Sequence, residues 1–148
     1  MTYKATNVFT TKFIELSLSA DQTVTASSTL VDFDTITPSG SGVSLVSGGN
    51  GRIRFTGGKS YFLHGCVAID RTSTSAVYTA KWYNTSGVEQ VEAAGACNSE
   101  TADALTTESR VCQLLINPSS DVDYDLKVEG AAGDIKADGT NLIIMEFS

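Results

Sequence analysis

The stretch VDYDLKVE, residues 122–129, alternates strictly between apolar and charged side chains. Val122, Tyr124, Leu126 and Val128 share one side of an extended chain, and the charged residues between them share the other. This period of two predicts a β-strand with one buried and one solvated face. The segment LVDFDTI, residues 30–36, follows the same pattern, with two apolar side chains predicted to point inward and two aspartates outward.

Three further segments are apolar on both sides: SYFLHGCVAI at residues 60–69, RVCQLLI at 110–116 and LIIMEF at 142–147. A strand with two apolar faces needs a cover on its outer side as well as on its inner side. No helical periodicity is visible that could supply this cover. We therefore expect another subunit to lie against these strands.

Turn residues separate the predicted strands at fairly regular intervals, for example at residues 48–51, 57–58, 84–87 and 117–120. Short strands at such spacing, without a strand–helix–strand rhythm, are typical of an antiparallel sandwich or barrel. We predict an all-β antiparallel sandwich of about eight to ten strands. The 148 residues contain no internal repeat and fit one domain.

The charge balance argues against nucleic acid as a partner. Ten Lys and Arg residues stand against seventeen Asp and Glu residues, the net charge is −7, and the basic residues are scattered singly. No stretch approaches the ~18 apolar residues that cross a bilayer, so we expect no membrane partner. The first thirteen residues, MTYKATNVFTTKF, lack the features of a signal peptide, and we expect synthesis in a cytoplasm.

Candidate catalytic residues are few. The single histidine, His64, is followed on the same strand face by Cys66, but a nucleophilic site also needs an orienting carboxylate. We interpret His64 as a packed core residue. Asp121, Asp123 and Asp125 alternate along one strand, which is typical of a solvated face; calcium binding or glycoside hydrolysis is the alternative. The prediction is therefore no enzyme, no metal and no cofactor.

The three cysteines have no C-x-x-C spacing, so we predict reduced thiols, with a Cys97–Cys112 disulfide as the alternative. Trp82 and Tyr83 are adjacent and must point to opposite faces of a strand. One is predicted in the core, and the other is either packed at a subunit interface or available as a ligand platform. The sequon at residues 84–86 is interpreted as an ordinary turn.

Two segments together resemble the C1q/TNF-like jelly-roll family. LVDFD at residues 30–34 is followed about twenty residues later by GRIRFTGGKSYFL at 51–63, with Gly57 and Gly58 near the family's second glycine. NLIIMEF at residues 141–147 is similar to the family's last strand. The resemblance spans roughly residues 13–148 and implies an antiparallel jelly-roll sandwich.

The resemblance also implies a threefold homotrimer around an apolar axis. We predict that the trimer interface contains five residues of the last strands: Tyr124, Leu126, Ile143, Met145 and Phe147. The chain departs from the secreted animal members in two respects, because it has no Gly-x-y stem and no signal peptide pattern. Similar jelly-roll trimers occur in tailed bacteriophages as capsid decoration proteins and fibre knobs.

The expected function is accordingly that of a virion structural protein, a trimeric decoration (cement) protein or head fibre on the capsid surface, with the major capsid protein as partner. The alternatives are a receptor- or glycan-binding knob of a phage fibre and a bacterial C1q/TNF-like binding module. Residues 1–12 are predicted to form an N-terminal arm that anchors the domain of residues 13–148. Its anchoring residues are predicted to be Tyr3, Lys4, Val8 and Phe9.

Overall fold

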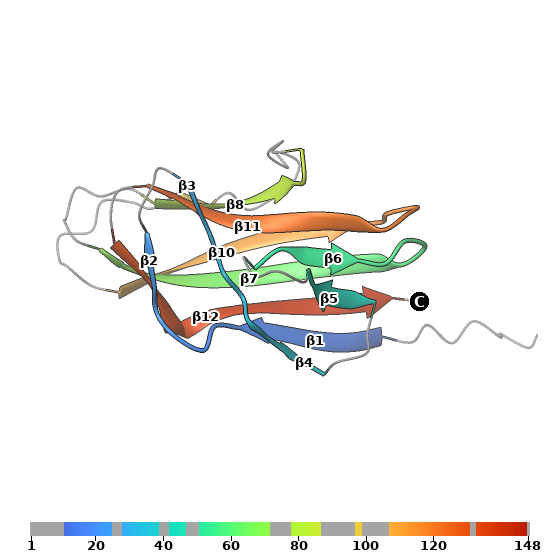
Figure 1. The fold of residues 1–148 in the computed structure, drawn as a ribbon, viewed down its shortest axis with the longest axis horizontal. Coiled ribbons are helices and arrows are strands. Elements are labelled where there is room, and N and C mark those ends of the chain that lie inside the picture. The colour runs from blue at the N-terminus through green and yellow to red at the C-terminus, as the bar shows by residue number, and fades with distance from the viewer. Residues whose placement is uncertain are drawn as a thin grey trace, which may run out of the picture.

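Residues 11–24, 28–38, 42–46, 51–71, 78–86, 97–98, 107–130 and 133–147 are described by a computed structural model. These residues form twelve strands and no helix (Figure 1). Six of the strands have three residues or fewer, which accounts for the difference from the eight to ten expected. The strands are β1 (Thr11–Ser17), β2 (Gln22–Val24), β3 (Ser28–Leu30), β4 (Thr35–Thr37), β5 (Val43–Leu45), β6 (Ile53–Phe55), β7 (Ser60–Arg71), β8 (Tyr78–Asn84), β9 (Cys97–Asn98), β10 (Thr107–Ile116), β11 (Val122–Gly130) and β12 (Gly133–Phe147).

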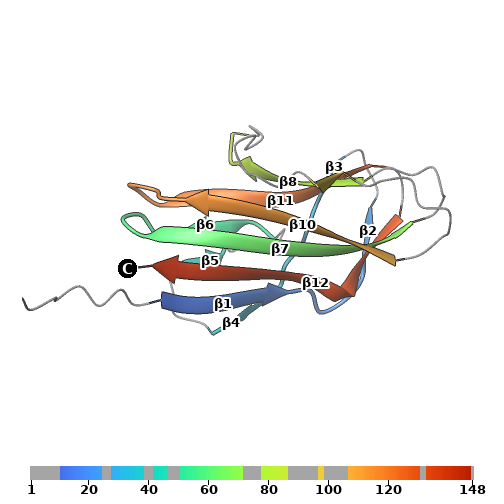
Figure 2. The ribbon, with the colours of Figure 1, turned by 180° about the vertical axis from the view of Figure 1, so that it is seen from behind.

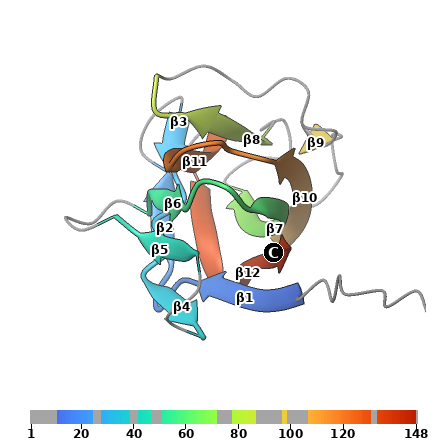
Figure 3. The ribbon, with the colours of Figure 1, turned by 90° about the vertical axis from the view of Figure 1, so that its right-hand side faces the viewer.

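The strands form two antiparallel sheets that pack face to face (Figure 3). Sheet A has the order β10-β7-β12-β1-β4, with β2 paired to β12. Sheet B has the order β5-β6-β11-β8-β9, with β3 paired to β11. The predicted all-β antiparallel sandwich is confirmed.

The alternation in β11 places its apolar side chains between the sheets, as predicted. Leu126 and Val128 are fully buried, and Val122 and Tyr124 pack against the same core. The predicted solvated side of β11 needs a correction at Asp125, which is only 3% exposed because Arg52 covers it. The largest fully buried side chains come from both sheets: Trp82, Tyr61, Tyr78, Phe33, Phe55, Ile14, Leu16, Ile53, Leu63, Ile69, Leu126 and Ile135.

Residues 30–36 connect the two sheets, and they do not form the single strand that we predicted. The segment leaves β3 in sheet B and enters β4 in sheet A. Val31 and Phe33 are nonetheless buried, and Asp32 and Asp34 are exposed, as the alternation predicts. The Val31 N–H donates to the Leu126 carbonyl at 2.8 Å. Alternation therefore identified which side chains are buried, but an extended crossover shows the same pattern as a strand.

Gly51 allows the chain directly before β6 to approach this crossover closely. Its φ of +63° lies in the left-handed region, which side chains other than glycine rarely adopt. A Cβ at position 51 would lie 2.0 Å from the Val31 carbonyl oxygen. Only glycine therefore fits here without displacing the crossover.

β12 is the central strand of sheet A, and its pairing with β1 places the first and last described strands side by side. It pairs with β1 from Thr11 opposite Phe147 to Ser17 opposite Asn141. On its other side it pairs with β7, with a bulge between Lys136 and Asn141. Figure 2 shows β10, β7, β12 and β1 side by side in this order.

The structure bears on three further predictions, which concern the N-terminal arm, the cysteines and the membrane. β1 begins at Thr11, and the predicted arm residues Tyr3, Lys4, Val8 and Phe9 lie outside the described residues. Cys66 and Cys112 are reduced thiols, so the alternative Cys97–Cys112 disulfide is not formed. In the part of the chain that is described, no helix is long and apolar enough to span a bilayer.

Candidate functional site: the outer face of sheet A

A line of large apolar side chains crosses the outer face of sheet A. Phe13 of β1 is opposite Met145 of β12, Met145 is opposite Phe62 of β7, and Phe62 is opposite Leu115 of β10. We call these four residues the apolar row. Their sequence neighbours Ile14, Ile144, Leu63 and Leu114 are all buried in the core. Because side chains alternate along a strand, the apolar row points away from the core.

The apolar row and its neighbours are open to solvent in the single chain. Leu115 is 70% exposed, Phe13 is 63% exposed and Val111 is 36% exposed. Phe62, Cys66, Ile143, Met145 and Phe147 face the same side and are partly exposed. Contiguous apolar patches of this kind are rare on soluble monomers and mark interaction sites. The outer face of sheet A is therefore the candidate functional site.

A row of mixed polarity lies next to the apolar row, two residues further along β1 and β7. Its members are Glu15, Ile143, His64 and Gln113 on β1, β12, β7 and β10. Gln113 Nε2 lies 2.8 Å from His64 Nδ1, so the amide donates to that nitrogen when the imidazole is neutral. The prediction that His64 is a core residue is wrong, because it occupies the outward side of β7 and is only partly buried.

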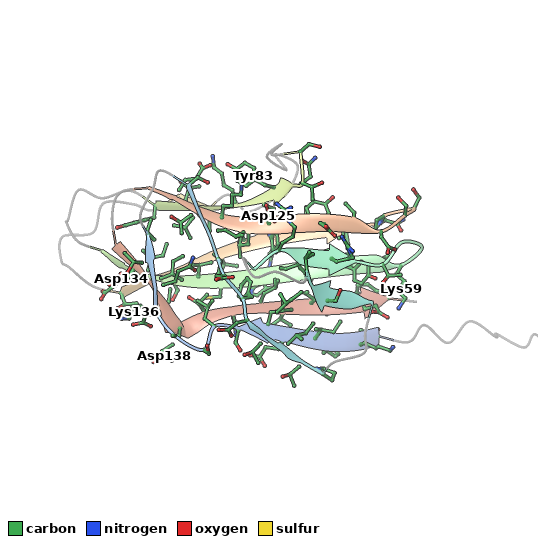
Figure 4. The ribbon with its side chains drawn as sticks, viewed as in Figure 1. Lys59, Tyr83, Asp125, Asp134, Lys136 and Asp138 are labelled. Carbon is green, nitrogen blue, oxygen red and sulfur yellow. The ribbon has the colours of Figure 1, made fainter. Side chains whose placement is uncertain are left out.

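The other end of this face is charged. Beyond the bulge in β12, Lys136 lies opposite Ala68, and Asp134 lies opposite Asp70. Lys136 forms an ion pair with Asp21, and the hydrogen bond from Lys136 is the main reason that the pKa of Asp21 lies below its usual value. Figure 4 shows Asp134 and Lys136 at the end of the molecule opposite Lys59. The apolar part of the face is thus confined to the half that contains Phe147.

The outer face of sheet B has a different character, because its charged side chains pair with one another. Arg54 donates to both carboxylate oxygens of Asp123, at 2.7 and 2.9 Å, and Arg52 donates to those of Asp125, at 2.9 and 3.0 Å. The hydrogen bonds from Arg54 hold the pKa of Asp123 below its usual value. A face of paired charges is typical of a surface in water.

These pairs also decide the interpretation of the alternating aspartates. The carboxylates of Asp123 and Asp125 accept hydrogen bonds from arginine side chains. Asp121 accepts a hydrogen bond from the Gly57 N–H at 3.0 Å. The arrangement fixes β6 and the β6–β7 turn to β11. Among the described residues there is no group of three or more His, Cys, Asp or Glu that could hold a metal ion.

Trp82 and Tyr83 separate to opposite faces, as predicted. Trp82 is in the core and 1% exposed. Tyr83 lies on the outer face of sheet B, where Lys127 Nζ stands 4.8 Å from the ring centroid. Its hydroxyl hydrogen-bonds Glu129, which also pairs with Lys81 at 3.1 Å. Figure 4 shows Tyr83 and Asp125 on this side of the molecule.

A buried carboxylate lies inside the end of the sandwich next to the apolar row. Glu146 of β12 points inward and is 0% exposed. It accepts hydrogen bonds from Lys59 Nζ and the Gly42 N–H, each at 2.7 Å. Burial alone raises the pKa of Glu146, but the hydrogen bonds from Lys59 and Gly42 outweigh it, and the net shift is downward. Glu146 is therefore held as a charged carboxylate by this cluster.

The five residues predicted at a trimer interface divide between two places. Ile143, Met145 and Phe147 lie on the outer face of sheet A. Leu126 is fully buried in the core, and Tyr124 packs against Phe55 with ring centroids 6.0 Å apart. Both belong to β11 of sheet B and point inward, so their prediction is corrected: they stabilise the single chain.

The prediction also omitted the two most exposed members of the apolar row, Phe13 and Leu115. The signal for Leu115 was present, because residues 110–116 are apolar on both sides. Phe13 carries no such signal, because only the pairing of β1 with β12 brings it beside Met145.

No family model and no curated protein matches the sequence. Among solved structures, the chain is similar to murine APRIL, crystallised at pH 8.5, with a TM-score of 0.60 and 16% identity; the match covers 91% of this chain and 99% of that one. It is also similar to the Eiger TNF of S. frugiperda, with a TM-score of 0.57 and 11% identity, covering 95% and 93%. At these identities the likeness shows the fold. The chain has a TNF-like jelly-roll fold, as the resemblance implied.

Proposed function

We propose that this chain is a non-enzymatic structural protein that assembles as a homotrimer through the outer face of sheet A. The apolar row carries the proposal, since Phe13, Met145, Phe62 and Leu115 form a continuous line of apolar side chains on the surface of the single chain. Covering such side chains contributes roughly 1.5–3 kcal/mol for each one that goes from fully exposed to fully buried.

A second copy of the chain suits this face better than a charged partner. Three rows of side chains cross this half of the face: the apolar row, the row that contains Glu15 and His64, and a third row of Ser17, Asn141, Cys66 and Val111. Among the side chains of these three rows, Glu15 is the one that is charged. Each copy carries a net charge of −7, so three copies repel one another at long range. Assembly is therefore favoured where the contact is nearly uncharged. The trimer itself is what the C1q/TNF-like resemblance implies.

The more specific proposal is that the trimer is a decoration protein on the head of a tailed bacteriophage, with the major capsid protein as its partner. It is supported by the small, acidic, Ser- and Thr-rich sequence and by the jelly-roll fold. In this proposal, the chain before β1 anchors each subunit to the shell, whereas Thr11 and Lys12 of the predicted arm belong to β1 and pair with β12. The trimer then reinforces the shell because it buries surface area on neighbouring capsid subunits.

The first test is the mass in solution, measured by light scattering after size exclusion. We expect a mass near three times 15.6 kDa for the native chain. Phe62→Glu should give a folded monomer, because it places a charge in the middle of the apolar row. Ser44→Glu, at an exposed position of β5 in sheet B, is the control and should remain a trimer. A native chain that runs as a monomer would refute the proposal.

The second test concerns the virion. Mass spectrometry of purified phage particles from the host that encodes the chain should detect it as a stoichiometric component. Particles that lack the chain would overturn the decoration role and leave the trimer in place. Specific binding of the trimer to a glycan array, together with that absence, would favour a receptor-binding knob.

A further inference from the structure

The chain has one histidine, and it lies in the middle of the surface proposed to assemble. His64 is on the outward side of β7, between Phe62 and Cys66 on its own strand. Imidazole groups ordinarily change charge near pH 6.5, whereas carboxylates do so near pH 4. The side chain of His64 is of the one type that ordinarily changes charge close to neutral pH, and the sequence contains no second histidine.

The outward-facing neighbours of His64 offer it little charge. On β10 the facing residue is Gln113, a neutral amide hydrogen-bonded at 2.8 Å. On β12 the facing residue is Ile143, which is apolar. On β7 the titratable neighbour is the Cys66 thiol, two residues away. On β1 the charged group is Glu15, which lies beyond Ile143 at two strand spacings, or roughly 10 Å.

The remaining charges on this face are further away. They lie past the β12 bulge, where Lys136 is opposite Ala68 and Asp134 is opposite Asp70. Four residues along a strand correspond to about 13 Å. Within one chain, no described carboxylate therefore stands next to the His64 imidazole to stabilise its protonated form.

We propose that His64 makes the assembly pH-dependent, so that the subunits associate while the imidazole is neutral and separate when it is protonated. This inference rests on the proposed trimer. A second copy that covers the outer face of sheet A removes water from His64 and supplies mainly apolar groups in its place. Desolvation disfavours the charged imidazole, so the assembled form binds fewer protons than the separate chains. By linkage, lowering the pH then favours the separate chains.

The expected size follows from three copies acting together. If assembly lowers the proton affinity of each imidazole tenfold, the trimerisation constant falls about fivefold per chain between pH 7.5 and 5.5. Over three copies this amounts to about a hundredfold. The same pH change leaves most carboxylates charged, so their mutual repulsion changes little over this range.

Sedimentation equilibrium at pH 7.5, 6.5 and 5.5, at constant ionic strength and with a reductant, tests the inference. The native chain should show the hundredfold fall. His64→Gln keeps a neutral hydrogen-bonding side chain beside Gln113 at every pH, and its trimerisation constant should stay constant within about threefold. Circular dichroism at pH 5.5 should show that the separate chains remain folded.

The outcomes separate this inference from the proposed function. A trimer whose association constant is the same at pH 7.5 and 5.5, or a His64→Gln variant that falls as far as the native chain, overturns the role of His64 alone. Stronger association at pH 5.5 also overturns it, and loss of that gain in Glu15→Gln would identify Glu15 of a neighbouring copy as its partner. A monomer from pH 5.5 to 8.5 refutes both proposals.

Discussion

Leu114 and Leu115 are adjacent on β10 and point to opposite sides of sheet A, which allows association and folding to be tested separately. Leu115 is 70% exposed in the single chain, whereas Leu114 is 7% exposed and belongs to the core. Full burial of a leucine contributes roughly 1.5–3 kcal/mol, so covering the exposed share of Leu115 contributes about 1–2 kcal/mol per copy. Over three copies this is about 3–6 kcal/mol, or a factor of about 10²–10⁴ in the trimerisation constant.

Leu115→Ala should therefore weaken trimerisation by about that factor in sedimentation equilibrium. Leu114→Ala is the matched control. It should leave trimerisation nearly unchanged and lower the free energy of unfolding by about 2–5 kcal/mol, because it leaves a cavity in the core. Unfolding is best measured with urea in the Phe62→Glu background, where dissociation does not contribute to the transition. Equal trimerisation constants for Leu115→Ala and the native chain would refute the assignment of this face as the interface.

Three further predictions concern the fold. Gly51→Ala should lower the free energy of unfolding in urea by more than about 2 kcal/mol, and Gly58→Ala by only about 1–2 kcal/mol. Both glycines have a positive φ, but only a Cβ at position 51 would meet a backbone atom, the Val31 carbonyl oxygen 2.0 Å away. Lys59→Met should lower the free energy of unfolding by about 1–3 kcal/mol at pH 7, because it removes the hydrogen bond from Lys59 to the buried Glu146 carboxylate and leaves only Lys12, 3.9 Å away, as its lysine partner. The pKa of Glu146 is lowered in the folded chain, so its contribution to stability is lost as the pH falls through that pKa, and the difference between variant and native chain should narrow below pH ~4.5. Burial raises the pKa of Tyr61 to about 12, so a spectrophotometric titration should show one phenol ionising near that pH that is missing in Tyr61→Phe. The stability of the native chain should fall as the pH rises from about 10 to about 12, because the folded form retains that proton longer than the unfolded form.

Each of these has an outcome that would contradict it. Equal costs for the two glycine variants would show that the backbone at Gly51 can move away from Val31 without a loss of stability. A Lys59→Met deficit that stays constant from pH 7 to pH 3 would mean that Glu146 does not depend on the lysine for its charge. A phenol count near pH 12 that is the same in Tyr61→Phe would contradict the burial of the Tyr61 hydroxyl.

The sequence predicted the sheets better than the surfaces. Period-two alternation identified β11, and apolar runs bounded by turn residues identified β7, β10 and β12, because burial leaves a direct record in the residue types. Alternation could not distinguish the crossover at residues 31–34 from a strand, since both are extended and both bury alternate side chains. Hydrogen bonding to neighbours, which is what differs between them, is not encoded locally.

The candidate site was predicted in part. Apolar residues on both sides of β7, β10 and β12 were enough to indicate an exposed apolar face. Assigning Leu126 to that face failed, because it requires knowing which sheet β11 joins and which side of it is covered. Phe13 and His64 were misjudged for the same reason: their surroundings come from strands distant in sequence.

The pairing of β1 with β12 has a consequence for how this protein is made. Ribosomes add about 5–20 residues per second, so β1 precedes its partner strand by on the order of ten seconds. During that time, the core residues Ile14 and Leu16 and the exposed Phe13 have no neighbouring strand on the β12 side. Sheet A can close only after nearly the whole described chain has emerged. We therefore expect sheet A to close late and slowly, and newly made chains to depend on dilution or chaperones until β12 is in place.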